Sequence, residues 1–137
     1  YAFVGLAASA MYWIIAPVDA IFATVTSEIG SVGVYLPVYD ETKAYEKEGI
    51  KVELIKAGKL KGLGYPGTSL SESGREHLQG RVNEIYEMFK AHVRAHRGAG
   101  ISDDSMQGQT FLAEEAKTRG LIDEIVRDRQ HMMQLLR

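Results

Sequence analysis

The sequence contains no cysteine, which excludes disulfide bonds, thiol nucleophiles and thiolate metal sites. It also lacks a marked excess of either charge, because 16 basic and 18 acidic residues leave a net charge of −2. We therefore expect neither nucleic acid nor an anionic membrane surface as a partner. What remains is an ordinary globular composition, 45% hydrophobic and 25% charged over 137 residues, which suits one domain with a modest core.

Metal ligands are also scarce. The four histidines include His92 and His96, whose i, i+4 spacing places both on one face of a helix. No acidic ligand pattern such as H-E-x-x-H accompanies them. We therefore predict that the protein uses no metal ion and no other cofactor.

The N-terminal stretch has little charge, since Asp19 is the only charged residue before Glu28, and it invites comparison with a membrane span. Pro17 and Asp19 interrupt it, so two short buried elements fit better than one spanning helix. It has neither a basic start nor an initiator methionine, and we predict that it is not a signal peptide. Because the chain begins at Tyr1 within a predicted strand, we expect the N-terminal portion of the domain to be missing.

Apolar periodicity and turn residues predict an α/β protein. Strands are expected at 1–5, 19–24, 31–39, 50–55 and 121–125, and helices at 10–16, 41–48, 69–97, 110–119 and 126–136. The order of strand 31–39, helix 41–48 and strand 50–55 predicts a crossover that joins two parallel strands. Residues 56–68 form a loop with four glycines and one proline, long enough to be a functional candidate.

Ser9 lies where the first predicted strand gives way to the first predicted helix. A serine at this position has its hydroxyl and the next backbone N–H near the positive end of the helix. An acyl-transfer enzyme places its nucleophile and an oxyanion donor at such a point. The same position also suits a serine that only caps the helix, so the residues by themselves leave both interpretations open.

The segment Ala8-Ser9-Ala10-Met11-Tyr12-Trp13 resembles the nucleophile motif of the signal peptide peptidase A family of serine peptidases. That family includes membrane-bound signal-peptide hydrolases and soluble phage relatives that process capsid or scaffold proteins. Four further segments resemble family motifs in the same order, namely DAIFA at 19–23, EIGSVGV at 28–34, AGKLK at 57–61 and the stretch 111–123. Together they extend over nearly the whole chain.

The resemblance implies a ClpP/crotonase-like fold of stacked ββα units, with residues 1–137 forming a single peptidase domain. It places Ser9 at the nucleophile, Lys61 at the general base and Ser31 at the residue that orients the lysine. The backbone N–H of Ala10 becomes one oxyanion donor. The family's second donor comes from a glycine-rich turn before the nucleophile, and we expect this chain to start after that turn.

The chemistry is consistent with these roles. A serine hydroxyl needs a base to take its proton, and no histidine lies in a suitable loop for a Ser-His-Asp arrangement. A lysine serves as a base only when its amine is neutral, a form that burial favours, and Leu60, Leu63 and Tyr65 are candidates for apolar cover of Lys61. Taken alone, however, Lys61 also fits a solvated loop lysine with an equally basic neighbour in Lys59, and Ser31 fits a strand-edge hydroxyl.

Peptide binding is expected along Gly30, Val32 and Gly33. A strand with an exposed edge beside the nucleophile can pair with an extended peptide through backbone hydrogen bonds. The alternative is an internal strand that is fully paired within the sheet.

The leading hypothesis is therefore a serine endopeptidase that acts on signal peptides or phage capsid and scaffold proteins through a Ser9–Lys61 dyad. One alternative is a catalytically inactive, oligomeric assembly module of the same fold. Another is a crotonase-like enzyme acting on acyl-CoA thioesters, which the Ser9–Lys61 spacing disfavours. Expected partners are a peptide or protein substrate and further copies of the chain, with membrane association undecided. The expected location is cytoplasmic, as for phage-type relatives, or membrane-anchored and facing the periplasm or the cell exterior.

Overall fold

The computed structural model describes all residues from 1 to 137. They divide into two compact units, the first formed by residues 1–34 and 84–137 and the second by residues 35–83. No helix combines the length and the apolar character that a bilayer span requires. The expectation that residues 1–137 act as a single domain stays a prediction.

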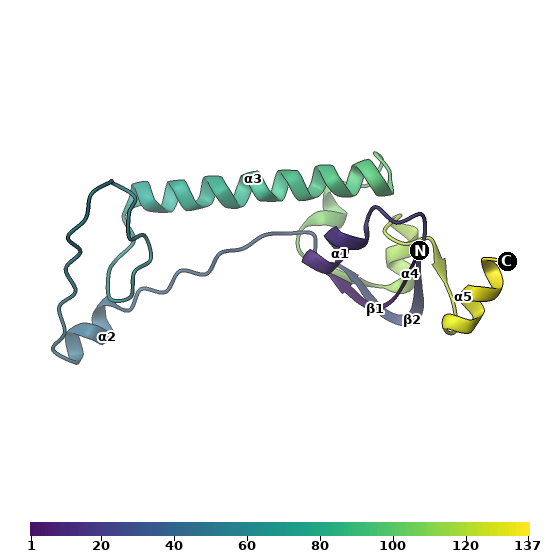
Figure 1. Cartoon of the computed structure of the whole chain (residues 1–137), viewed down its shortest axis with the longest axis horizontal. Helices are drawn as coiled ribbons and strands as arrows, with labels where there is room; N and C mark the ends of the chain where they lie inside the picture. Colours follow the sequence, from purple (N-terminus) through teal and green to yellow (C-terminus); the bar gives the residue numbers. More distant parts are fainter. The chain divides into compact units, whose positions relative to one another are not determined.

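The first unit is built on a four-stranded mixed sheet. Its strands are β1 (Ala2–Ala8), β2 (Ile21–Gly30), β3 (Thr110–Leu112) and β4 (Glu124–Ile125). The central strand β2 pairs in parallel with β1 and β4 and antiparallel with β3. Helix α1 (Ala10–Ile15) connects the parallel strands β1 and β2, as Figure 1 shows. The chain is therefore a mixed α/β protein with parallel strand pairing.

Strand β2 is continuous from Ile21 to Gly30, but its pairing with β1 is irregular. Its register with β1 shifts between Val4 and Leu6. The buried hydroxyl of Ser27 accepts a hydrogen bond from the Thr24 N–H at 3.0 Å and donates to the Val4 carbonyl at 2.8 Å. One side chain thus satisfies backbone groups that the irregular register leaves without ladder partners.

The remaining helices are α2 (Thr42–Lys47), α3 (Glu72–Arg97), α4 (Ala113–Thr118) and α5 (Arg129–Leu135), with a 3₁₀ turn at Asp103–Met106. Helix α3 begins in the second unit and ends in the first. In the first unit, its Phe89 and Val93 are fully buried together with residues of the sheet such as Ile21 and Ile29. Every buried hydrophobic side chain of the protein belongs to this first unit.

Asp123 anchors the start of β2. Its backbone N–H donates to the Ile21 carbonyl at 3.0 Å, and its carboxylate accepts from the Ile21 N–H at 2.7 Å. The same carboxylate oxygen accepts from Arg97 at 2.6 Å, and the Arg97 side chain is only 6% exposed. One carboxylate therefore ties the last residue of α3 to the first residue of β2.

The second unit is held together by local contacts. The Asp40 carboxylate accepts from the N–H and the hydroxyl of Thr42 at the start of α2, and these hydrogen bonds lower the pKa of Asp40. The helix begins at Thr42 rather than at the predicted residue 41, so Asp40 lies one residue before the N-cap, Glu41. Gly67, with φ +76°, packs directly against the side chains of Tyr45 and Val52.

The predicted strands 31–39 and 50–55 are wrong, because neither segment pairs with a strand. Their β-forming residues remain on the surface, with Tyr35 at 88% and Ile55 at 102% exposure. Alternating residues favour an extended chain, but a strand also needs a neighbour for its backbone groups. The parallel pair predicted there is instead formed by β1 and β2 around α1. The predicted helix 110–119 begins as β3 and becomes helical only from Ala113.

We expect Gly67→Ala to loosen the second unit more than Gly64→Ala does. Both glycines have positive φ, so alanine costs about 1–2 kcal/mol of backbone strain at either position. At Gly67 the added Cβ would also lie 2.7 Å from Tyr45 and Val52, whereas at Gly64 nothing lies within 4 Å. Amide hydrogen exchange across residues 35–83 measures the difference, and equal exchange in the two variants would contradict it.

We expect Asp123→Ala to lower the free energy of unfolding by about 2–4 kcal/mol, because it leaves the Ile21 N–H and a nearly buried guanidinium without their partner. The neighbouring substitution Glu124→Ala is the matched control. It removes a pair with Lys117 in which both side chains are at least 40% exposed, and its cost should stay below about 1 kcal/mol. Urea denaturation of both variants decides the point, and similar losses would refute the role given to Asp123.

Candidate active site

Ser9 lies at the sharp turn between β1 and α1. Its backbone has φ 53° and ψ −125°, its side chain makes no capping hydrogen bond to the helix, and the residue is exposed. The turn is held on both sides, because the Ser9 N–H donates to the Gly30 carbonyl at 2.9 Å and its carbonyl accepts from the Trp13 N–H at 3.0 Å. The interpretation of Ser9 as a side-chain cap is therefore wrong. A strained strand-to-helix turn that exposes a serine is one geometry in which acyl-transfer enzymes present their nucleophile.

Ser31 occupies the equivalent place on the neighbouring strand. It has φ 50° and is half-buried, and its N–H donates to the Gln109 carbonyl at 2.8 Å. The parallel register pairs Ala8 with Gly30, so Ser9 and Ser31 each follow the last residue of adjacent strands. The sheet therefore brings the two predicted serines to the same edge.

These two serines share a further property. They are the only non-glycine residues of the chain with positive φ. Such a conformation costs an L-residue on the order of 1–3 kcal/mol and clusters at functional sites. Two of the residues that the family resemblance indicates are thus the residues at which the backbone is strained.

Ala10 is the first residue of α1 and is exposed. The N–H groups of the first helical turn have no acceptor within the helix. The Ala10 N–H can therefore donate to a group beside Ser9, as an oxyanion donor must.

Lys61 belongs to the second unit, whereas Ser9 and Ser31 belong to the first. It lies in a turn whose backbone closes with a hydrogen bond from the Lys61 N–H to the Gly58 carbonyl at 3.1 Å. Its side chain is exposed, and the expected covering residues Leu60 and Tyr65 are themselves 37% and 53% exposed. The unit that carries Lys61 does not bury its amine.

The predicted peptide-binding residues follow β2. Val32 is fully buried, backbone included, and its carbonyl already accepts from the Gly108 N–H at 3.0 Å. A Cβ on Gly33 would lie 2.9 Å from the Gly108 Cα, and one on Gly30 would lie 3.1 Å from the Gln109 carbonyl oxygen. One edge of this segment is thus occupied by residues 108–109, and both glycines are needed for the close approach.

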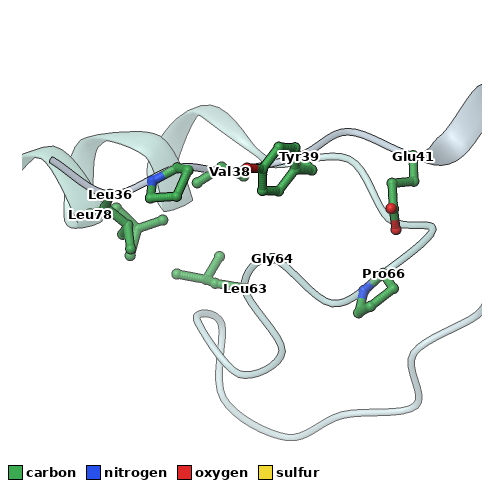
Figure 2. A pocket seen from close by; sticks show the side chains of 9 residues that line it. Leu36, Val38, Tyr39, Glu41, Leu63, Gly64, Pro66 and Leu78 are labelled. Carbon is green, nitrogen blue, oxygen red and sulfur yellow. The ribbon is translucent and has the colours of Figure 1, made fainter.

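The loop that carries Lys61 also lines a pocket within the second unit (Figure 2). Its volume is about 430 Å³, and Glu41 is the only charged residue among its lining. Leu36, Leu63 and Leu78 contribute apolar side chains. A pocket of this character suits an apolar group rather than a charged one.

The histidines are not arranged as a metal-binding site. The rings of His92 and His96 lie 4.6 Å apart, but no group of three or more histidine and acidic side chains is arranged to hold an ion. His92 instead contacts the carbonyl of Trp13 through Nε2 at 3.0 Å.

The sequence did not predict the contacts that hold Ser9 and Ser31 in place. Gln109 and Gly108 hold the Ser31 segment, and His92 contacts the helix behind Ser9. The close approach of Gly33 to Gly108 has a weak signal in the sequence, because two backbones that come this close often need glycine on both sides. The contact between His92 and Trp13 has no signal in the sequence, because the two residues are far apart in the chain.

Comparison with known proteins identifies a peptidase family. The profile of peptidase family S49 matches residues 2–136. A protein of Methanocaldococcus jannaschii with a provisional protease name is 37% identical over 88% of this chain and 40% of its own length. The capsid assembly protease C of Escherichia phage lambda is 33% identical over 75% of this chain and 24% of the phage protein. A protein of Enterococcus faecium, provisionally named signal peptide peptidase SppA, is 31% identical over 90% of this chain and 37% of its own length.

The chain belongs to peptidase family S49. The resemblance drawn from its motifs is therefore confirmed. The chain spans less than half the length of each of these relatives.

We expect Ser9→Gly to be more stable than Ser9→Ala by about 1 kcal/mol, because glycine adopts the Ser9 backbone conformation without Cβ strain. Thermal or urea unfolding measures the difference. Ala8→Gly, one residue earlier in a regular strand, is the control and should lose about 0.5–1 kcal/mol. A Ser9→Ala variant that equals or exceeds Ser9→Gly in stability would show that the turn is not strained.

Proposed function

We propose that this chain carries the active site of a serine endopeptidase. Ser9 is the nucleophile, Lys61 the general base, Ser31 the residue that orients the lysine, and the Ala10 N–H an oxyanion donor. The observation that carries the proposal is the exposed Ser9 hydroxyl on a strained strand-to-helix turn, in a chain of a peptidase family.

The reaction follows acyl-transfer chemistry. The Ser9 Oγ attacks the carbonyl carbon of the scissile peptide bond while its proton passes to the neutral Lys61 Nζ. The developing oxyanion accepts a hydrogen bond from the Ala10 N–H. The tetrahedral intermediate then breaks the C–N bond, and the lysine returns the proton to the leaving amine. Water, deprotonated by the same lysine, hydrolyses the acyl-enzyme and releases Ser9.

Lys61 needs cover to act as this base. A charged ammonium cannot accept a proton, and desolvation is the general means of favouring the neutral amine. Because Lys61 is exposed in its own unit, we propose that a bound peptide excludes water from it. Within the second unit, the apolar pocket that Leu63 lines suits an aliphatic side chain. Within the first unit, backbone pairing with a peptide is proposed for the segment from Gly30 to Gly33, in which Gly33 is only half-buried.

The names of two relatives support a proposal for the substrate class. One is named a capsid assembly protease and another a signal peptide peptidase. We propose a peptide or protein substrate of one of these kinds, and a ClpP/crotonase-like arrangement for the fold. The location follows the substrate, cytoplasmic for a capsid or scaffold protein and membrane-associated for a signal peptide.

A second candidate is an inactive assembly module of the same family. The observation in its favour is the second unit, which has no buried hydrophobic side chain and exposes Tyr35, Tyr39 and Ile55. Such a surface suits association with further copies of the chain. A chain with an unreactive Ser9 that nevertheless assembles would support this candidate.

The two candidates differ in the reactivity of Ser9. We expect a fluorophosphonate probe to label the chain at Ser9 and to leave Ser9→Ala unlabelled. Lys61→Ala should slow labelling at least about 10²-fold, the usual contribution of a general base. Lys59→Ala, two residues away in the same loop and equally basic, is the matched control and should label at the original rate. A wild-type chain that fails to label, or a reversal of the two lysine variants, would overturn the proposal.

A further inference from the structure

The position of Ser9 depends on a very short helix. Helix α1 has six residues, and helices of this length are not stable in isolation. Its orientation must therefore come from contacts with the rest of the first unit. Tyr12 provides one, because its buried hydroxyl donates to the Leu121 carbonyl at 2.8 Å, and burial raises the pKa of this phenol so that it remains a donor.

Trp13 provides two more contacts, both with α3. Its ring stacks on Phe89 with centroids 4.4 Å apart and planes inclined by 20°. Its backbone carbonyl lies 3.0 Å from His92 Nε2. A carbonyl oxygen only accepts hydrogen bonds, so Nε2 must carry the proton.

The contact with His92 replaces a helix hydrogen bond that the sequence cannot form. In a continuing helix the Trp13 carbonyl would accept from the N–H four residues later. That residue is Pro17, which has no N–H. The preceding bond of the series is present, from the Ala16 N–H to the Tyr12 carbonyl at 2.9 Å. His92 therefore donates to the Trp13 carbonyl, which lacks a helical partner because Pro17 has no N–H.

We propose that His92 is a positioning residue for Ser9, acting through the Trp13 carbonyl. By replacing the missing N–H of Pro17, it fixes α1 against α3 and so holds the Ser9 turn and the Ala10 N–H in place. His92 touches neither the nucleophile nor the peptide. The inference rests on the proposed function of Ser9 for its consequence, although the structural link from His92 to α1 does not.

The test compares two variants of the full chain by their rate of fluorophosphonate labelling. His92→Gln places an amide nitrogen near the position of Nε2 and keeps the donor, whereas His92→Leu keeps much of the bulk without it. We expect His92→Leu to label about tenfold more slowly, since small displacements of a reacting group have large effects on rate. His92→Gln should restore most of the rate. His77→Leu, at an exposed position in the part of α3 that belongs to the second unit, should label normally.

A rescue experiment separates positioning from general packing. In the His92→Leu background, Pro17→Ala supplies an N–H four residues after Trp13, and Ala16 already has helical φ and ψ. We expect this second substitution to recover part of the lost labelling rate. If His92→Leu labels like the wild type, or if neither His92→Gln nor Pro17→Ala restores the rate, the proposal is wrong.

The failure of the proposed function would be recognised separately. A wild-type chain that does not label refutes the role of Ser9, and hydrogen exchange of the α1 amides then decides the role of His92. We expect His92→Leu to accelerate that exchange, and His92→Gln to leave it near the wild-type rate. Unchanged exchange in His92→Leu would overturn the positioning role.

Discussion

The parallel pairing of β1 with β2 is the constraint on which the candidate site depends. Because the register pairs Ala8 with Gly30, both strands end at the same level of the sheet, and Ser9 and Ser31 are the next residues. The hydrogen bond from the Ser9 N–H to the Gly30 carbonyl continues this ladder by one step. A register slip of one residue would turn the side chains to the opposite face, so the position of both hydroxyls is set by the sheet.

The surroundings of the two serines explain how their strained backbones persist. A residue in a sparsely populated conformation needs neighbours that over-determine it. Ser9 is held by Gly30 and by a helix that Tyr12, Trp13 and His92 attach to the core, and Ser31 is held by residues 108–109. Lys61 has no comparable framework, since its unit relies on turns and glycine contacts rather than on a buried core. The proposed nucleophile is thus preorganised, whereas the proposed base depends on what covers it.

Local signals accounted for the elements that were predicted well. The start of α1 after Ser9 and the end of α2 before Gly49 follow from residues within one turn, and both agree with the structure. The strand predictions for segments 31–39 and 50–55 were wrong. A strand needs a partner elsewhere in the chain, and β propensity does not reveal whether one is there. The same limit applies to His92. Its i, i+4 spacing from His96 was only a weak indication of a metal ligand, and the structure places it in contact with α1 instead.

The sequence by itself determined the family, the mixed α/β class and the identity of the candidate nucleophile, because ordered motifs and local capping patterns are properties of the chain. It also determined that α1 would lack a hydrogen bond, since Pro17 has no N–H to offer. Only the tertiary structure decided that Ser9 and Ser31 share one sheet edge, that both are strained, and that His92 supplies the missing donor. These features arise from hydrogen bonds between residues 21 to 79 positions apart, and no local pattern encodes such pairings.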